Sequence, residues 1–410
     1  MSRRIWAHDP TIHAPAKYKR ACGYEAFIPD AMSSLALQFD GTLAGLVAEA
    51  ELAIRALNDE GGPALDPLAR LLLRTEAIAS SKVEGLQLGV RELARAEARS
   101  ESGTTPSPTA VELIANIDAM VLAVDKAAEV ERFGVPEIVA IHTQLLDRTT
   151  QRAIAGRIRE KQNWIGGNDY NPCGADFVPP PPDIVDQLLT DLCEAIDDQT
   201  LSPLVQAALV HAQFETIHPF LDGNGRTGRA LVHVILRRRG IAPRFLPPLS
   251  VIFAGAKDRY ITGLTKFRGD AVNDWIEHFA VATLRATRIA RAYMDAVRSL
   301  QASWRAKLRA SRHDPRADAA AWLIIDHLPA HPMITAPVAT AITRRARGRI
   351  YEGIEQLVDA GVLMPLSEGK RNRCWEAVGL LDLVAGLESG ELPAMNDSAA
   401  VTDRGDSTLG

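Results

Sequence analysis

The sequence predicts a mainly α-helical fold with one short β-hairpin in its middle and a smaller helical unit near its end. Apolar residues recur at helical spacing through most of the chain. The segment 156–182 is instead rich in Gly, Pro, Asn and aromatic residues, so it cannot continue a helix. Beyond residue 306, short helical patterns precede two short apolar runs. With 410 residues, the chain is long enough for two or three domains.

Composition excludes several classes of protein. The formal net charge is −5 with mixed signs throughout, so any contact with nucleic acid or anionic membrane must be local. No apolar run approaches the roughly 18 residues that a membrane span needs, and no apolar segment follows the basic N-terminus. We therefore expect a protein that is neither secreted nor embedded in a membrane. The four cysteines are scattered along the chain without metal-ligand spacing: Cys22, Cys173, Cys193 and Cys374. This distribution argues against a zinc site and against a disulfide framework, and it favours a reducing cytoplasm.

The first hundred residues predict an irregular arm followed by helices. Residues 1–30 are rich in Pro, Lys and aromatic residues without periodicity, so we expect an arm that lies over the core. Helical spacing follows over 33–58, as one or two helices, and over 67–84, where an Asp-Pro pair supplies an N-cap and a first-turn proline. Residues 97–108 predict a polar linker.

The end of the helix over 67–84 carries an unusually placed charge. Glycine is the usual residue just past a helix C-terminus, so Gly85 by itself explains why the helix ends there. Glu84, however, would lie in the last turn, where the helix dipole disfavours an anion by about 1 kcal/mol or less. A cation supplied from elsewhere in the fold would explain its presence.

The middle of the chain predicts a helical core around one irregular segment. Within that segment, 164–167 and 176–178 could pair as a short hairpin whose edge adds an extended peptide, and a packed surface loop is the alternative. The helix expected over 202–217 is apolar on most of its surface and should be central. The other helices are expected over 111–128, 135–146, 184–197, 227–239, 257–265 and 273–304.

The C-terminal part predicts a winged helix. Helical patterns over 318–327, 336–342 and 344–360 precede two short runs, 361–364 and 374–375, that flank a polar turn over 367–372. Basic residues on the third helix and in the turn fit either DNA phosphates or a protein contact: Arg344, Arg345, Arg347, Arg349, Lys370, Arg371 and Arg373. The resulting division is a helical region at 1–104, a catalytic domain at 105–305, a winged helix at 306–380 and a disordered tail at 381–410.

One loop, from Ile217 to Arg229, concentrates the groups that polyphosphate chemistry needs. Each residue has an ordinary structural explanation taken singly, as a helix stop, a tight turn or a surface charge. Taken together, the Gly-Asn-Gly run opens backbone N–H groups at the start of a helix, which is an anion site. Arg226 and Arg229 share a face near that helix start, where bound phosphate would offset their unfavourable position. Asp222 could hold Mg²⁺, and His218 could accept a proton at neutral pH.

The loop resembles the signature of the Fic family, HxFx[D/E]GNGRxxR. It matches at every defined position: His218, Phe220, Asp222, Gly223, Asn224, Gly225, Arg226 and Arg229. The segment Ser80-Ser81-Lys82-Val83-Glu84-Gly85 is similar to the motif [S/T]xxxE[G/N] of Fic proteins whose inhibitory helix lies N-terminal in the same chain. The resemblance extends from Tyr24 to about Val378. It implies a Fic-type helical core with a hairpin flap, a preceding helical region and a following winged helix.

For the chemistry, the resemblance implies transfer of AMP from ATP to a protein hydroxyl. His218 would deprotonate a Tyr, Thr or Ser side chain, and Asp222 would position Mg²⁺ on the α and β phosphates. Phe220 would anchor the loop, while the stretch 223–228, including Thr227 and Gly228, would contact the nucleotide. Arg226 would stabilise charge on the leaving pyrophosphate.

For regulation and substrate binding, the resemblance implies three further roles. Arg229 would contact the γ-phosphate or pair with Glu84, which would leave ATP in an unproductive pose. The flap over 164–180 would align the target by strand addition. Tyr260 falls where relatives carry a Tyr-rich segment lining the nucleotide pocket, although Arg259 stands where a first Tyr is common.

These observations lead to one principal function and two alternatives. The principal hypothesis is an autoinhibited, Mg²⁺-dependent protein adenylyltransferase that uses ATP and modifies a target protein or itself. The first alternative is a nucleotide-sensing regulator that binds DNA through the winged helix. The second is transfer of a phosphoryl or phosphocholine group by the same loop. An exposed apolar face on the N-terminal helices would indicate a homodimer.

Overall fold

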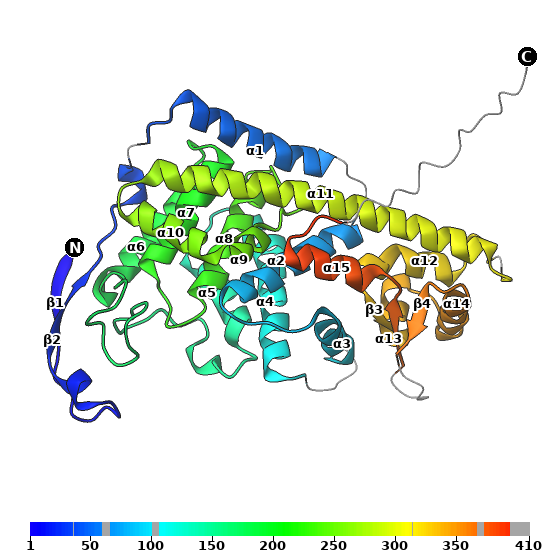
Figure 1. Ribbon diagram of the computed structural model, residues 1–410, viewed down its shortest axis with the longest axis horizontal. Coiled ribbons are helices and arrows are strands. Elements are labelled where there is room, and N and C mark those ends of the chain that lie inside the picture. The colour runs from blue at the N-terminus through cyan, green and yellow to red at the C-terminus, as the bar shows by residue number, and fades with distance from the viewer. Residues whose placement is uncertain (36, 60–65, 101–105, 314, 367–372, 394–410) are drawn as a thin grey trace, which may run out of the picture.

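A computed structural model gives the fold and describes every residue except 36, 60–65, 101–105, 314, 367–372 and 394–410. A helical body and a smaller C-terminal unit are joined by one long helix, α11 (Val272–Ala310), which runs along both (Figure 1). Helix α1 (Gly41–Asp59) lies beside α11 on the outside of the body. In the part of the chain that the structure describes, no helix has the length and apolar character needed to cross a bilayer.

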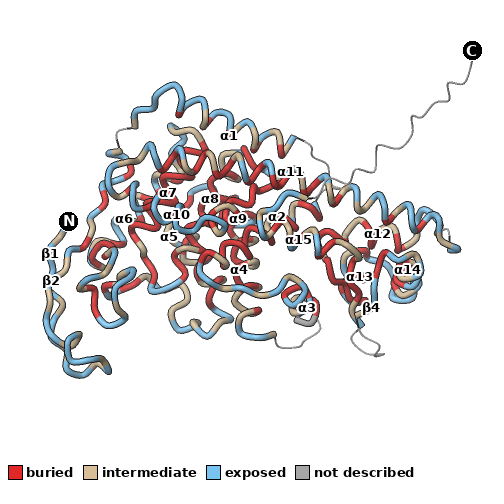
Figure 2. The backbone as a smooth tube through the Cα atoms, viewed as in Figure 1, coloured by how far each residue is buried: buried red, intermediate tan, exposed pale blue. Residues whose placement is uncertain are grey.

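Two buried helices form the centre of the body. Every residue of α7 (Pro203–Ile217) is buried, and most of α8 (Asn224–Arg238) is buried too (Figure 2). Pro203 occupies the first turn of α7, where its missing N–H costs no hydrogen bond. Trp275 of α11 donates from its indole nitrogen to the carbonyl of Ala208 (2.8 Å), which fixes α11 against α7. The prediction of a central helix over 202–217 is confirmed.

The other helices of the body pack around this pair. Helix α2 (Asp66–Val83) matches its predicted range to within a residue at each end, and α5 matches its range of 135–146 at both ends. Two helices of the body, α3 and α9, were not predicted. Because α3 extends to Ser100, the predicted polar linker over 97–108 is wrong over 97–100. The helices are α3 (Val90–Ser100), α4 (Pro108–Asp125), α5 (Val135–Leu146), α6 (Val185–Asp197), α9 (Leu249–Gly255) and α10 (Lys257–Arg268).

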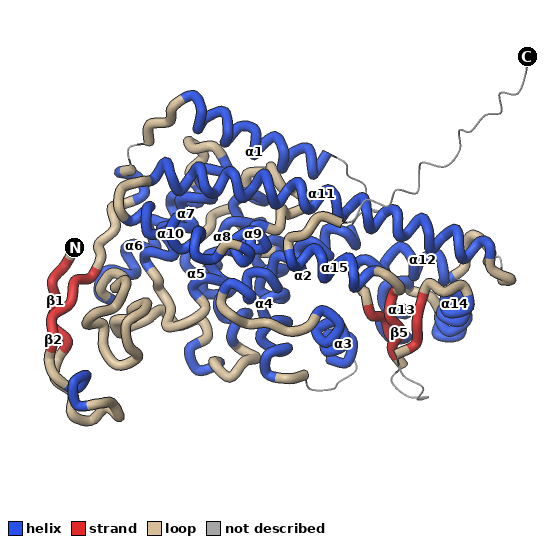
Figure 3. The backbone as a smooth tube through the Cα atoms, in the orientation of Figure 1, coloured by secondary structure: helices blue, strands red, loops and turns tan. Residues whose placement is uncertain are grey.

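The N-terminal arm is a β-hairpin rather than an irregular segment. Strand β1 (Ser2–Trp6) pairs antiparallel with β2 (Cys22–Ala26), in a register that places Arg4 opposite Tyr24. The hairpin projects from one end of the molecule, and the C-terminal sheet lies toward the opposite end (Figure 3). Short 3-10 helices occur at Ala16–Lys19, Met32–Ser34, Ala127–Glu129, Arg152–Ile154, Pro182–Ile184 and Leu328–Ala330.

A disulfide joins the arm to the middle of the chain, which overturns our expectation from cysteine spacing. Cys22 and Cys173 are bonded across 151 residues of sequence, whereas Cys193 and Cys374 take no part in a disulfide. Spacing along the chain could not reveal this pair, because only the folding back of the arm brings the two residues together. The argument for a reducing cytoplasm therefore loses its basis.

The flap contains less β structure than predicted. Among the described residues between 156 and 182, the only β-pairing is one antiparallel bridge, between Ile165 and Phe177. The rest of the segment is held by side chains and turns, so the structure combines the two alternatives, a minimal hairpin and a packed loop.

The C-terminal unit contains the predicted helices and hairpin plus one further strand. The sheet order is β3-β5-β4, and β3 was not predicted. Arg344 and Arg345 precede α14 rather than lying on it, and residues 381–389 are helical rather than disordered. The predicted turn over 367–372 and the tail beyond 393 lie outside the described residues, and the assignment as a winged helix stays a prediction. The elements are α12 (Ala320–His327), β3 (Met333–Thr335), α13 (Ala336–Thr343), α14 (Arg347–Asp359), β4 (Leu363–Pro365), β5 (Cys374–Ala377) and α15 (Leu380–Ser389).

Candidate functional site

The predicted loop connects α7 to α8 and is shaped by two left-handed residues. His218 ends α7 with φ of 50°, and Gly223 precedes α8 with φ of 77°. A non-glycine residue with positive φ is uncommon, so His218 must be held there by its surroundings. A Cβ on Gly223 would also crowd the His142 ring at 3.1 Å. Helix α8 begins at Asn224, three residues earlier than predicted, and its first turn therefore starts inside the motif.

Phe220 and Asn224 lock the loop onto the core. Phe220 is fully buried, and its ring stacks on His142 with centroids 3.7 Å apart. The Asn224 side chain accepts from the Phe220 backbone N–H (2.9 Å) and donates to the Phe220 carbonyl (2.8 Å). The role expected for Phe220 as an anchor agrees with this geometry. The side chain of Asn224 is occupied within the loop, which leaves its backbone as the group that could face a phosphate.

His142 was not predicted, yet it supports the loop from α5. Its Nδ1 accepts from the backbone N–H of Gly156 (2.9 Å), so its Nε2–H donates to the carbonyl of Asp222 (2.9 Å). Burial lowers the pKa of His142 to about 4, so this neutral tautomer persists at neutral pH. No spacing in the sequence links residue 142 to the motif.

His218 is half-buried and neutral at physiological pH. Burial, helped by the nearby Arg268 and Arg159 cations, lowers the pKa of His218 to about 4. Its Nδ1 faces the carbonyl of Glu215 at 3.4 Å, and donation there leaves Nε2 as the acceptor. An imidazole in this state can take a proton from a hydroxyl.

The backbone of His218 is fixed by two residues that precede the flap, and no pattern in the sequence singles them out. Arg159 donates from Nε to the carbonyl of His218 (2.8 Å), and Asn163 donates to the same oxygen (3.1 Å) and to the carbonyl of Phe220 (2.9 Å). Arg159 is buried and also donates to the carbonyls of Pro180 (2.5 Å) and Ile217 (3.3 Å). The flap and the loop therefore form one hydrogen-bonded unit.

Asp222 is exposed at the mouth of the loop and is suited to a hard cation. Its carboxylate accepts from the backbone N–H of Gly223 and from the side chain of Gln151, and Arg226 lies 3.8 Å away. Among the described residues, no group of three or more His, Cys, Asp or Glu could hold a metal ion. A single carboxylate such as that of Asp222 can contribute to a Mg²⁺ site, because this ion is usually held by one or two carboxylates together with phosphate oxygens and water.

Arg226 is a buried cation with unused donors. It is 3% exposed, and its Nε and Nη1 have no hydrogen-bond partner among the described residues. Burial lowers its pKa, which shows that the surroundings penalise its charge. An anion at the start of α8 would satisfy these donors.

Arg229 contacts the end of α2 and supplies the cation that would explain the position of Glu84. It donates from Nε to Ser80 Oγ (2.8 Å), and from Nη2 to the Ser80 carbonyl (2.8 Å) and to Glu84 Oε1 (2.7 Å). For Glu84, burial would raise the pKa, but the charges and hydrogen bond of Arg229, with Arg226 and Lys257, lower it overall. For Arg229, burial would lower the pKa, and Glu84 raises it overall. The Glu84 carboxylate and the Arg229 guanidinium are therefore both charged.

The Glu84 carboxylate lies against the first turn of α8. A Cβ on Gly225 would overlap Glu84 Oε1 and would lie 2.9 Å from an Arg229 nitrogen. The backbone at this helix start favours an anion, and the Glu84 carboxylate lies there. Gly85, with φ of 86°, turns the chain away just after it.

The end of α2 is braced by a further residue, Asn116 of α4. Its side chain donates to the Ala77 carbonyl (2.6 Å) and to Ser81 Oγ (2.9 Å). Ser80 and Ser81 are fully buried, so this end of α2 is packed and not a loose tail.

Tyr260 lies behind the loop and not on an open surface. It is 4% exposed, and its hydroxyl is 2.8 Å from His211 Nε2. It adjoins a buried carboxyl, Glu215, and the Arg229 cation. Burial raises the pKa of Glu215 to about 7, and one of its oxygens lacks a partner among the described residues. The tyrosine therefore packs behind Arg229, and a direct role in lining the nucleotide stays a prediction.

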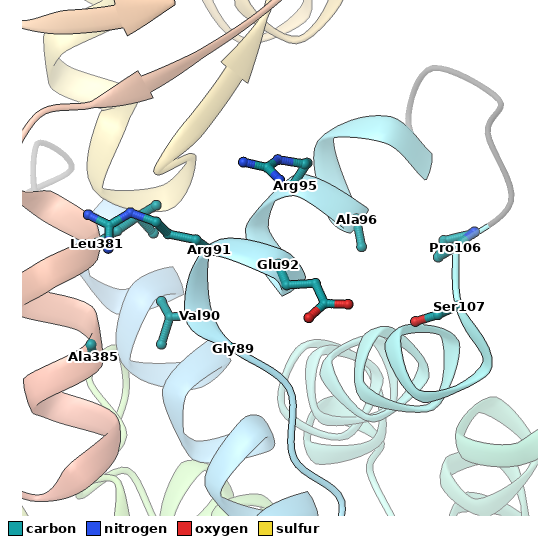
Figure 4. A pocket seen from close by; sticks show the side chains of 10 residues that line it. All are labelled: Gly89, Val90, Arg91, Glu92, Arg95, Ala96, Pro106, Ser107, Leu381 and Ala385. Carbon is teal, nitrogen blue, oxygen red and sulfur yellow. The ribbon is translucent and has the colours of Figure 1, made fainter. Parts of the chain in front are cut away.

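The structure thus brings together all the predicted residues of the loop and of the α2 end. A cavity of about 770 Å³ lies away from these residues, between α3, α15 and the start of α4, where it is lined by Arg91, Glu92, Ser107 and Leu381 among others (Figure 4). None of its lining residues belongs to the motif.

Comparison with known proteins finds similarity in the regions that contain the motif loop and the end of α2. Residues 133–236 match the model of the Fic/DOC family, and residues 45–125 match the model of its N-terminal region. The protein adenylyltransferase fic-1 of Caenorhabditis elegans is 33% identical over 122 residues, which is 29% of this chain and 22% of that protein. A probable protein adenylyltransferase of Aquifex aeolicus is 35% identical over 100 residues, which is 24% of this chain and 29% of that one. The match thus spans less than a third of each of these relatives.

Solved structures show the same fold. A Fic family protein from Desulfovibrio desulfuricans superposes with a TM-score of 0.51 at 20% identity, covering 84% of this chain and 98% of that one. Residues 134–508 of Fic-1 from C. elegans superpose with a TM-score of 0.51 at 20% identity, and the match covers 62% of this chain and 73% of that one. At these identities the likeness concerns the fold alone.

Proposed function

Because this chain belongs to the Fic/DOC family, we propose that it is an autoinhibited protein adenylyltransferase that uses ATP. It transfers AMP to a tyrosine, threonine or serine hydroxyl of a protein target or of itself. The observation that carries the proposal is the meeting of Glu84 and Arg229 at the start of α8, beside a neutral histidine.

The chemical step needs one proton acceptor and a stabilised leaving group. As the target oxygen bonds to the α-phosphorus, its proton passes to Nε2 of His218. The bond from the α-phosphorus to the bridging oxygen breaks, and pyrophosphate leaves. Arg226 supplies its unused donors to the phosphates, and the backbone N–H groups of 224–226, which have no intrahelical partner at the start of α8, face them. Asp222 would hold Mg²⁺, which neutralises phosphate charge when bound.

Inhibition follows from competition for one helix start. The Glu84 carboxylate occupies the place where a phosphate would meet Gly225 and Arg229. Two anions at that place repel each other, so ATP is held with its phosphates displaced while Glu84 stays. Transfer requires the end of α2 to withdraw or the Glu84 charge to be removed.

The test is incubation of the full chain with labelled ATP and Mg²⁺, followed by mass spectrometry. Glu84→Gly should raise protein labelling by about tenfold or more, because it removes both the carboxylate and its charge. Glu84→Gln, which keeps the shape, is the matched control and should give an intermediate rise. The adduct should have the mass of AMP, which separates this activity from phosphoryl or phosphocholine transfer.

Two results would overturn the proposal. One is an absence of label from Glu84→Gly on any protein, including the chain itself and a host lysate. The other is equal labelling after His218→Ala is added to Glu84→Gly.

A second candidate function is a nucleotide-sensing regulator that binds DNA. Its support is a continuous exposed run, 344–349, which carries four arginines around the start of α14. Binding to a DNA pool should weaken with salt and be lost when Arg344, Arg345 and Arg347 are replaced by alanine. Replacing three exposed arginines of α11, at positions 285, 288 and 291, is the matched control. No retention on DNA at low salt would exclude this function.

A further inference from the structure

The N-terminal hairpin is attached to the flap. Its backbone reaches the flap through Phe27, whose N–H donates to the carbonyl of Val178 (2.9 Å). The Asn171 side chain donates to the carbonyl of Tyr18 (3.0 Å). The disulfide between Cys22 and Cys173 adds a covalent link. Three separate contacts therefore join the arm to residues 171–178.

Aromatic side chains pair across the same contact. Trp6 meets Trp164 edge-on with ring centroids 5.6 Å apart, and Tyr18 stacks on Tyr170 at 5.2 Å. Phe27 lies 5.9 Å from Phe177. Such pairs contribute about 0.5–1.5 kcal/mol each beyond the area they bury. The position of the arm is thus specified along the length of the flap.

The arm and the reacting histidine contact adjacent residues of the chain. Asn163 donates to the carbonyl of His218 (3.1 Å), and the next residue, Trp164, contacts Trp6 of β1. The flap carries two exposed large hydrophobic residues, Ile165 and Tyr170, and the motif loop carries one, Leu221. A protein segment that presents its hydroxyl to His218 would therefore lie near the arm.

The arm is basic, whereas the chain as a whole is acidic. Residues 1–26 contain five Lys or Arg and two Asp or Glu, and the chain carries a net charge of −5. Both carboxylates are already engaged, Asp9 by Thr11 (2.9 Å to its backbone N–H) and Glu25 by Arg3 (3.0 Å). Lys17 and Arg20 are exposed and have no carboxylate partner among the described residues. Arg4 pairs with Asp183 (3.4 Å), so Lys17 and Arg20 are the exposed cations of the arm that could meet an acidic segment.

Burial alone does not explain why the hairpin is held in this place. Most residues of β1 are exposed, Ile5 to 80%. An isolated two-stranded hairpin is marginally stable in water, so this one depends on its attachment to the flap. We propose that the N-terminal hairpin completes the target-docking surface of the flap and binds an acidic extended segment of the protein substrate. The inference rests on the proposed function, because it names the partner of the same site.

The test uses the full chain with Glu84→Gly and two probes. One is a short fluorescein-labelled peptide in which glutamates surround a single tyrosine, and the other has lysines in place of the glutamates. We expect the acidic peptide to bind more tightly by fluorescence polarisation. Adding Lys17→Glu and Arg20→Glu should weaken its binding about tenfold, with the loss reduced at high salt. Arg288→Glu with Arg291→Glu, on exposed positions of α11, makes the same change of charge and should leave binding unaltered.

A second measurement tests the attachment. Cys22→Ser with Cys173→Ser should raise KM for the acidic peptide in AMP transfer and leave kcat unchanged, because the loop chemistry stays intact. Dithiothreitol reduces the disulfide to two thiols and is itself oxidised to a cyclic disulfide. It should shift the protein with native cysteines to the KM of the serine variant and leave the serine variant unaffected.

The outcomes separate this inference from the proposed function. Equal affinity for both peptides, or an equal loss in the α11 control, would overturn the arm as an acidic docking surface, even with AMP transfer intact. If no protein is labelled but the acidic peptide still depends on Lys17 and Arg20, the docking surface stands and the transfer chemistry fails. Preference for a second copy of this acidic chain over the peptide would overturn the proposal of a separate substrate.

Discussion

The motif region and the N-terminal arm both contact the chain between residues 159 and 178, and they are held in different ways. The loop from His218 to Arg229 is fixed by buried hydrogen bonds and by stacking of Phe220 on His142. The arm is mostly exposed and is fixed by one covalent bond, two hydrogen bonds and three aromatic pairs.

This difference indicates a division of labour. A buried network tolerates no displacement, because each broken hydrogen bond leaves a polar group unpaired. An exposed arm can adjust to a partner at small cost. Changes in the motif region should therefore alter the chemical step and stability, and changes in the arm should alter only the affinity for the target.

The largest effect is expected at His218. In the Glu84→Gly background, His218→Ala should lower the rate of AMP transfer by about 10²–10⁴-fold, the usual contribution of a general base. Affinity for ATP, measured by calorimetry, should change little because the phosphate-facing groups remain. Arg20→Ala in the arm is the comparison and should leave the rate at saturating target unchanged.

The next effect concerns Arg159. Arg159→Ala should lower the free energy of unfolding by about 3 kcal/mol, because several buried carbonyls lose their donor. Arg157→Ala, two residues earlier and exposed, should change it by less than about 0.5 kcal/mol. Urea denaturation measures both, and equal values would contradict the role assigned to Arg159.

The buried carboxyl of Glu215 should make stability depend on pH. Its pKa is raised to about 7, above that of the unfolded chain, so its favourable contribution is complete below the unfolded value. That contribution is lost as pH rises through about 7. The stability of Glu215→Gln relative to the native protein should therefore increase by about 2 kcal/mol between about pH 5 and pH 8. A constant difference across this range, by urea denaturation, would contradict the raised pKa.

The smallest effect is expected at the contact of the arm with the flap. Trp6→Ala should weaken the attachment by about 1 kcal/mol and leave the global unfolding midpoint unchanged. Amide hydrogen exchange over 164–178 should become faster. Ile5→Ala, next to it but 80% exposed, should leave exchange as it was. Global destabilisation by Trp6→Ala would show that the arm is part of the core.

The sequence by itself determined the features that depend on neighbours along the chain. Helical periodicity placed α5 at its observed ends and identified α7 as buried, because periodic burial is a local pattern. The motif loop lies within thirteen residues, so its chemistry could be inferred without knowing the fold. The unfavourable position of Glu84 predicted a distant cation, and the structure supplies Arg229.

Only the tertiary structure decided which distant residues support the site. Arg159 reaches His218 across 59 residues, and Cys22 reaches Cys173 across 151. Such contacts depend on how the flap and the arm fold back, and no periodic signal records that path. The burial of individual side chains could also be known only from the fold. Burial lowers the pKa of His218, and Tyr260 lies buried behind the loop. Desolvation is a property of the packed surroundings, not of the residue or its neighbours in sequence.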